Sequence, residues 1–126
     1  MKRLLTILAA LAMTLVLLLP GCAAKTYTDS GQTIEIKQGQ EFVIALGSNP
    51  TTGYSWQANF DESLLKLVES NYGPGKESRE GLVGAGGIEY FKFRALGKGQ
   101  SEITLIYKRP WEEESIDQKL FTVNAN

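Results

Sequence analysis

Apolar and polar residues alternate along most of the chain after residue 32, which is the period of a β-strand with one buried face. Several stretches place apolar side chains at every second position. They are Ile34 and Ile36; Phe42, Ile44 and Leu46; Phe91, Phe93 and Ala95; Ile103, Leu105 and Tyr107; and Phe121 and Val123. Residues 61–68 could carry a turn of helix before a further strand through Leu65, Leu67 and Val68, which the sequence leaves open.

Glycines punctuate these strands. Residues 37–40 and 96–100 each contain a glycine between two alternating segments, and glycine supplies the positive φ that tight turns demand. The pattern therefore predicts tight hairpins at both places. About seven to eight short strands in one small domain favour an all-β, immunoglobulin-like antiparallel β-sandwich, with a small closed barrel as the alternative.

The first residues have the features of a targeting segment. Lys2 and Arg3 precede an apolar run over residues 4–19, which Pro20 and Gly21 end. The run is shorter than the ~20 residues that a membrane-spanning helix needs. The sequence therefore predicts a signal peptide over residues 1–21.

Cys22 follows this leader directly and is the one cysteine in the chain. Residues 19–22 resemble a bacterial lipobox, in which a small residue precedes the cysteine that is lipidated and becomes the new N-terminus. The resemblance implies a lipoprotein signal peptide, a lipidated Cys22 with a short tether over residues 22–32, a folded domain over residues 33–126, and attachment to a membrane of the cell envelope. The alternative is an ordinary signal peptide cut nearby, which leaves a free thiol.

Composition excludes several function classes. The 13 basic and 14 acidic residues give a net charge of −1, and loss of Lys2 and Arg3 would take it to −3. A weakly acidic chain with no basic run does not favour a nucleic-acid partner. The chain has no histidine, so histidine-dependent nucleophiles and histidine metal sites are impossible. No pair of carboxylates stands out, and we therefore expect neither an enzyme nor a metal or other cofactor.

Three clusters lie between predicted strands, where a sandwich could bring them to one end. They are Asn49, Pro50, Thr51, Thr52, Gly53 and Tyr54; Gly84, Ala85, Gly86 and Gly87; and Arg109, Pro110 and Trp111. Taken singly, each has an ordinary structural interpretation as a turn, a flexible loop or a tryptophan over a sheet edge. The glycine cluster is not a phosphate loop, because no Gly-Lys-Ser/Thr follows it and the next residues form a predicted strand.

Together, the motifs NPTTG with an aromatic residue, GxGG and RPW resemble those of the chagasin-like family of cysteine-protease inhibitors. The resemblance covers most of the chain after about Ser30. It implies a reversible inhibitor of papain-like cysteine proteases that fills the active-site cleft with three loops. In the family, the loop corresponding to Thr51 and Thr52 lies over the catalytic cysteine, and the glycine loop and Trp111 lie on opposite sides of it. We expect Tyr54 to pack beneath the first loop and Trp56 to belong to the core.

Other classes remain possible at this stage. An envelope lipoprotein that serves as a binding or adhesion module could use the same fold, and it would be expected to line a groove on a sheet face with aromatic side chains. A structural lipoprotein with incidental loops is a further alternative. The sequence gives no reason to expect more than a monomer.

Overall fold

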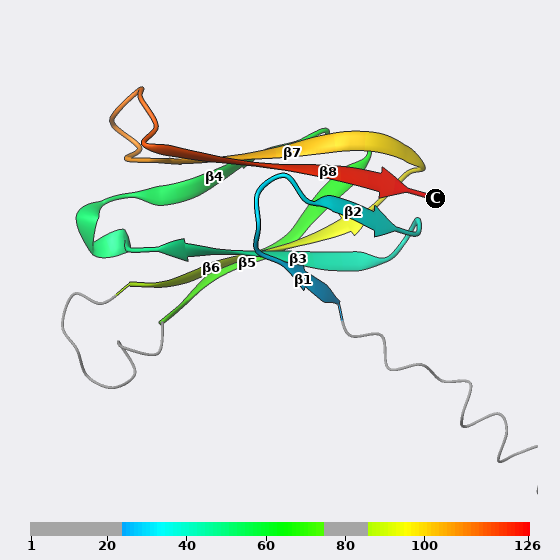
Figure 1. Cartoon of the computed structure of the whole chain (residues 1–126), viewed down its shortest axis with the longest axis horizontal. Helices are drawn as coiled ribbons and strands as arrows, with labels where there is room; N and C mark the ends of the chain where they lie inside the picture. Colours follow the sequence, from blue (N-terminus) through cyan, green and yellow to red (C-terminus); the bar gives the residue numbers. More distant parts are fainter. Residues whose placement is uncertain (1–23, 75–85) are drawn as a thin grey trace, which may run out of the picture.

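Two four-stranded β-sheets pack face to face in the computed structural model, which describes residues 24–74 and 86–126 (Figure 1). The first sheet contains, in spatial order, β1 (Lys25–Tyr27), β3 (Glu41–Ser48), β6 (Gly87–Ala95) and β5 (Leu65–Pro74). The second contains β2 (Thr33–Ile36), β8 (Asp117–Ala125), β7 (Gly99–Lys108) and β4 (Ser55–Asn59). The prediction of an all-β sandwich is confirmed.

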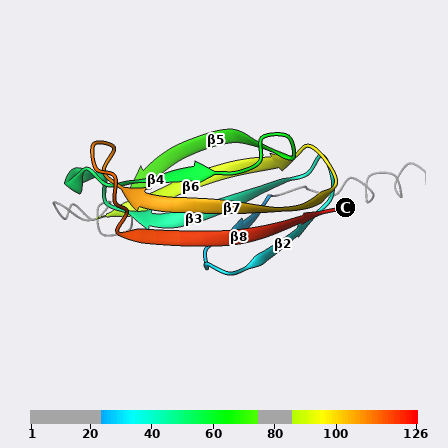
Figure 2. The same ribbon diagram turned by 90° about the horizontal axis from the view of Figure 1, so that it is seen from above.

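The core lies between the two sheets and consists of the alternating apolar residues. Phe42 and Phe93 stack with ring centroids 5.5 Å apart, and Phe121 of the second sheet is fully buried. Figure 2 shows that the strands of the two sheets run roughly along one direction, the aligned packing typical of sandwiches. The sequence period therefore identified the buried face of β3, β6, β7 and β8, whereas in β5 the register shifts after Leu67 and Val68 is exposed.

The two turns predicted as hairpins are instead crossings between the sheets. Residues 37–40 lead from β2 in the second sheet to β3 in the first, and residues 96–98 lead from β6 in the first sheet to β7 in the second. Gly39 does have a φ of +88°, as a tight turn requires. Alternation defines the buried face of a strand but does not identify the sheet to which the strand belongs, so the hairpin prediction was wrong.

In the segment 61–68, where the sequence left a turn of helix open, residues 61–64 form a turn and the strand follows. The backbone oxygen of Asp61 accepts hydrogen bonds from the N–H groups of Leu64 and Leu65 at 3.1 and 2.9 Å. Its carboxylate accepts two more from Ser63, which lower the pKa of Asp61. β5 begins at once after this turn.

The predicted tether over residues 22–32 is too long, because strand β1 lies inside it. β1 pairs in parallel with β3, and β2 pairs in parallel with β8, so the sandwich is not purely antiparallel. Tyr27 is only 8% exposed and meets the ring of Phe42 edge to face at 6.3 Å. β1 has only three residues in a polar segment, so the sequence shows no hydrophobic period there. The strand is recognised only from its pairing and packing with β3.

The predicted signal peptide and Cys22 lie outside the described residues. In the part of the chain that the structure does describe, no helix is long and apolar enough to cross a membrane.

If β1 belongs to the fold, Tyr27→Ala will destabilise the domain by about 3 kcal/mol, since it removes a buried aromatic ring. Urea denaturation of the chain from residue 24 onward measures the change. Thr26→Ala is the matched control in the same strand, because Thr26 is exposed and its loss should cost no more than about 0.5 kcal/mol. Equal midpoints for the two variants would show that β1 contributes nothing.

Candidate functional site

The described parts of the three sequence clusters gather at one end of the sandwich (Figure 1). The first cluster connects β3 to β4, and the third connects β7 to β8. Gly84 and Ala85 lie outside the described residues, but Gly86 does not. A Cβ placed on Gly86 would lie 3.0 Å from the backbone oxygen of Ser48 and 3.7 Å from Cβ of Asn49. The glycine cluster therefore reaches the base of the first loop.

The first loop is a short 3₁₀ turn over Pro50–Thr52 that its own hydrogen bonds hold closed. The Thr52 N–H and hydroxyl both donate to the backbone oxygen of Asn49, at 3.2 and 2.7 Å, and the Thr51 hydroxyl donates to the Asn49 side chain. Proline fixes φ at the start of the turn. Pro50, Thr51 and Thr52 are all exposed, so the turn presents a preformed tip.

Trp111 extends this tip. Its side chain is 72% exposed, the largest exposure among the large apolar residues of the described chain. The ring edge lies against Gly53, where an added Cβ would be 2.7 Å from Cη2 and 3.4 Å from Cζ2 of the indole. Gly53 also has a φ of +84°, which disfavours any residue with a side chain. The absence of a side chain at Gly53 is therefore what lets the third loop rest on the first.

Arg109 joins the same two loops through its side chain. Nε donates to the backbone oxygen of Thr52 at 3.0 Å, Nη1 donates to the Glu112 carboxylate at 3.0 Å, and the guanidinium lies 4.4 Å from the ring centre of Tyr54. The hydrogen bond to Glu112 raises the pKa of Arg109. Arg109 thus holds the two loops together within the protein, whereas its neighbours Pro110 and Trp111 are exposed.

An aromatic stack supports the loops from below. Tyr54 and Tyr107 stack at 5.4 Å, and Tyr107 meets Trp56 at 4.8 Å. The Tyr107 hydroxyl accepts a hydrogen bond from the Asn49 N–H at 2.9 Å, which ties β7 to the start of the first loop. Trp56 is 6% exposed. The expectations that Tyr54 packs beneath the loop and that Trp56 belongs to the core are confirmed. The support that Tyr107 gives to the first loop was not predicted, because in the sequence Tyr107 is one more apolar position of an alternating strand.

Among the predicted site residues that the structure describes, Gly87 is the one that is buried. It is the first residue of β6, and a Cβ there would collide with the backbone oxygen of Gly73 and with the ring of Tyr72 on β5. The glycine therefore allows β5 and Tyr72 to approach β6. Tyr72, which is 43% exposed at this end of the sandwich, covers the position and was not identified from the sequence.

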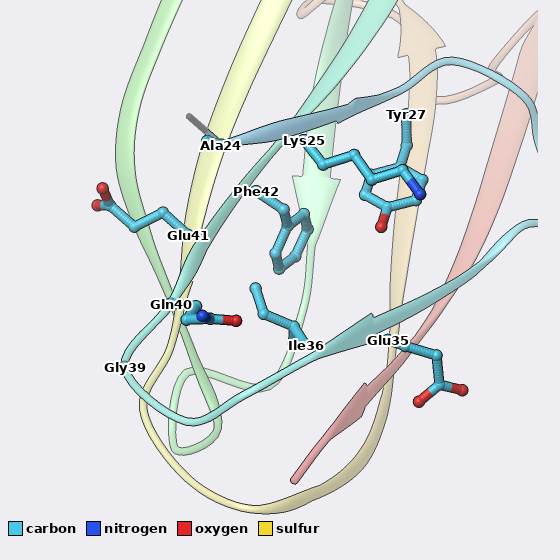
Figure 3. A pocket seen from close by; sticks show the side chains of 9 residues that line it. All are labelled: Ala24, Lys25, Tyr27, Glu35, Ile36, Gly39, Gln40, Glu41 and Phe42. Carbon is cyan, nitrogen blue, oxygen red and sulfur yellow. The ribbon is translucent and has the colours of Figure 1, made fainter. Parts of the chain in front are cut away.

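A cavity of about 380 Å³ lies at the opposite end of the sandwich, between β1, β2 and the start of β3 (Figure 3). Figure 3 shows Tyr27, Phe42 and Ile36 directed toward its centre, while the carboxylates of Glu35 and Glu41 point away. Glu41 is paired with Arg94 at 3.0 Å. Within the described ranges, no group of three acidic or cysteine side chains could hold a metal ion. The cavity is an opening at the edge of the core, far from the loops.

The chain from residue 35 to 125 matches the family model described as "Chagasin family peptidase inhibitor I42". Chagasin of Trypanosoma cruzi is 36% identical over 104 residues, which cover 78% of this chain and 91% of that protein. Amoebiasin-1 of Entamoeba histolytica is 35% identical over 101 residues, which cover 80% of this chain and 95% of that protein.

The fold is similar to that of a solved inhibitor. The crystal structure of the cysteine protease inhibitor EhICP2 from Entamoeba histolytica superposes with a TM-score of 0.76 at 26% identity, covering 85% of this chain and 99% of that one. The family consists of peptidase inhibitors and not of enzymes. The matched region includes all three loop clusters and nearly the whole sandwich that carries them, and the chain therefore belongs to the chagasin family of peptidase inhibitors.

Proposed function

We propose that this chain is a reversible, occlusive inhibitor of papain-like cysteine proteases. One observation carries the proposal: the exposed turn Pro50–Thr52 is braced by Arg109 and flanked by the exposed indole of Trp111, so a rigid tip and an apolar anchor stand side by side. Tryptophan is among the residues most enriched at the energetic centres of protein interfaces. The family of the chain supports a protease as the partner.

The geometry favours blocking over cleavage. A protease cleaves peptides that it holds in an extended conformation, whereas residues 50–52 form a closed 3₁₀ turn. The bonds from Thr51 and Thr52 to Asn49 would have to break before the chain could extend. Because the first and third loops are held by their own hydrogen bonds, they lose little conformational entropy on binding, and an interface of ~1,600 Å² can then be tight without a covalent bond.

The site is complete in one copy of the chain, which is why we propose a monomer as the inhibitory unit. The turn, Gly86 and Trp111 all come from the same sandwich. The alternative of a binding or adhesion module receives less support. The aromatic residues Tyr27 and Phe42 that line the distal cavity are core side chains, 8% and 1% exposed, and lie at an edge of the sandwich instead of on a sheet face.

We also propose that the protein is lipid-anchored in the cell envelope through Cys22, on the strength of the leader and the lipobox resemblance. The fold is compatible with this placement. Lys25 is paired with Phe42 near the start of β3, whereas the loops follow Ser48 at the end of that strand. An anchor just before Lys25 would therefore leave the inhibitory loops at the end of the domain that is remote from the membrane.

The chain from Ala23 onward is expected to inhibit papain-like proteases reversibly and to leave serine proteases of the trypsin type active. Steady-state titration of both enzymes measures this difference. Binding should persist, at reduced affinity, when a small group blocks the cysteine of the protease, because occlusion needs no bond to sulfur. Slow cleavage between Thr51 and Thr52 with loss of inhibition would identify a substrate instead.

Trp111→Ala should raise the inhibition constant roughly 30-fold, which corresponds to about 2 kcal/mol, because it removes a large anchor from the interface. The urea midpoint should stay nearly unchanged, since the side chain is 72% exposed. Ile116→Ala is the control in the same loop, because Ile116 is a similarly exposed apolar residue, at 62%, that is not part of the three motifs, and its inhibition should be near that of the unsubstituted chain.

A second pair of variants displaces the indole without removing it. Gly53→Ala and Gly39→Ala introduce the same strain, since φ is +84° and +88°, but only the first places a Cβ against Trp111. Inhibition should weaken in Gly53→Ala alone.

If Trp111→Ala unfolded the domain and the remaining folded fraction inhibited normally, Trp111 would be a core residue with no part in the interface.

Cys22→Ser should release the protein from the membrane fraction and leave its fold unchanged, because lipid attachment requires the thiol. Fractionation of cells and mass spectrometry of the N-terminal peptide measure the two effects. The control is the same analysis of the unsubstituted protein, whose N-terminal peptide should carry the added mass of acyl chains. An unmodified thiol at Cys22 would refute the lipid anchor.

A further inference from the structure

Glu89 places a carboxylate between the two sheets, where the sequence pattern would lead one to expect an apolar residue. It lies on β6, two and four residues before Phe91 and Phe93, so its side chain is on their inward face. Its partner across the sheet is Leu46, which is 3% exposed. Bringing a charged group to this face costs solvation unless the charge has a hydrogen-bond partner.

The partner is in the other sheet. Oε2 of Glu89 accepts a hydrogen bond from the backbone N–H of Trp56 at 2.9 Å. Trp56 lies on β4, an edge strand, so alternate N–H groups of β4 have no neighbouring strand in the second sheet. The carboxylate of Glu89 thus takes the place of that missing neighbour and joins the sheets. Hydrogen bonds to a charged acceptor are roughly twice as strong as neutral ones.

A second bond fixes Trp56 to the first sheet. Its indole Nε1 donates to the backbone oxygen of Gly47 at 2.9 Å. Gly47 and Trp56 flank the first inhibitory loop, one on each side, because the loop leaves β3 after Ser48 and enters β4 at Ser55. The two bonds together set the separation of the two ends of the loop.

Glu89 also lies close to the glycine cluster. It is three residues after Gly86, which meets Ser48 and Asn49 at the base of the first loop. From this arrangement we propose that Glu89 is a positioning residue for inhibition. It couples the exit of the glycine loop to the first loop through the Trp56 backbone, and so holds the two loops in the register that a protease cleft requires. This proposal rests on the proposed inhibitory function.

The test compares Glu89→Leu, which removes the acceptor at similar size, with Glu89→Gln, which retains a carbonyl oxygen. Glu41→Leu is the matched control, because it removes a carboxylate from the first sheet at the opposite end and breaks its pair with Arg94. Three quantities are measured on the folded chain from residue 23: the inhibition constant for a papain-like protease, hydrogen exchange of the Trp56 amide by NMR, and the urea midpoint.

Glu89→Leu should weaken inhibition about tenfold or more and accelerate exchange of the Trp56 amide by a similar factor, the size expected for one charge-assisted hydrogen bond. The amide resonances of residues 49–53 should shift as well. The urea midpoint need not fall, since leucine suits this inward face. Glu89→Gln should recover most of the inhibition, and Glu41→Leu should inhibit normally even if it lowers the midpoint.

The proposal is overturned if Glu89→Leu inhibits as well as the unsubstituted chain, or if Glu41→Leu loses inhibition to the same degree. Equal impairment of Glu89→Gln and Glu89→Leu would also overturn it, because a side chain that can still accept the hydrogen bond would then do no better than one that cannot. If the unsubstituted chain inhibits no papain-like protease, the proposed function fails. Exchange of the Trp56 amide and the resonances of residues 49–53 would still decide whether Glu89 couples the sheets.

Discussion

The attachment of Trp56 to the opposite sheet is the constraint on which the inhibitory end of this sandwich depends. The first loop runs from one sheet to the other, so its shape follows the separation and register of the sheets at that point. Through Nε1 and its backbone N–H, Trp56 binds Gly47 and Glu89 of the first sheet, while its ring packs on Tyr107 of its own sheet. Tyr107 in turn binds Asn49. Core packing and loop geometry are therefore one continuous network.

The motif residues fall into two groups: those whose side chains hold the loops in place, and those that remain exposed. Arg109 donates hydrogen bonds to Thr52 and Glu112, and Tyr54 lies beneath its guanidinium. The threonine hydroxyls are turned back onto Asn49. What is left on the surface is backbone, small side chains and the indole of Trp111. If these exposed groups meet a protease, as we propose, the affinity would come mainly from shape and from the indole, because Arg109 and the threonine hydroxyls already have partners inside the protein.

The sequence predicted the parts of the structure that local pattern controls. Alternation identified Phe42, Phe93 and Phe121 as core, since a half-buried strand needs a period of two whatever its neighbours are. It could not assign strands to sheets, because the crossing at Gly39 uses the same positive φ as a hairpin. β1 was not predicted for a related reason. Tyr27 is buried against Phe42 of β3, and this contact leaves no periodic pattern within residues 23–32. Glu89 was not singled out in the sequence, because its hydrogen-bond partner, the backbone N–H of Trp56, lies in the other sheet.

The glycines of the motifs show why a family signature is a poor guide to which residues touch the partner. A side chain at Gly53 or Gly87 would collide with a neighbour, and the neighbours differ. At Gly53 it is the indole of Trp111, and at Gly87 it is the backbone of Gly73 together with Tyr72. In each case the side chain is excluded by the inhibitor itself. The internal packing of the loops therefore requires glycine at both positions even if neither glycine meets a protease, and the residues that cover them, Trp111 and Tyr72, are exposed.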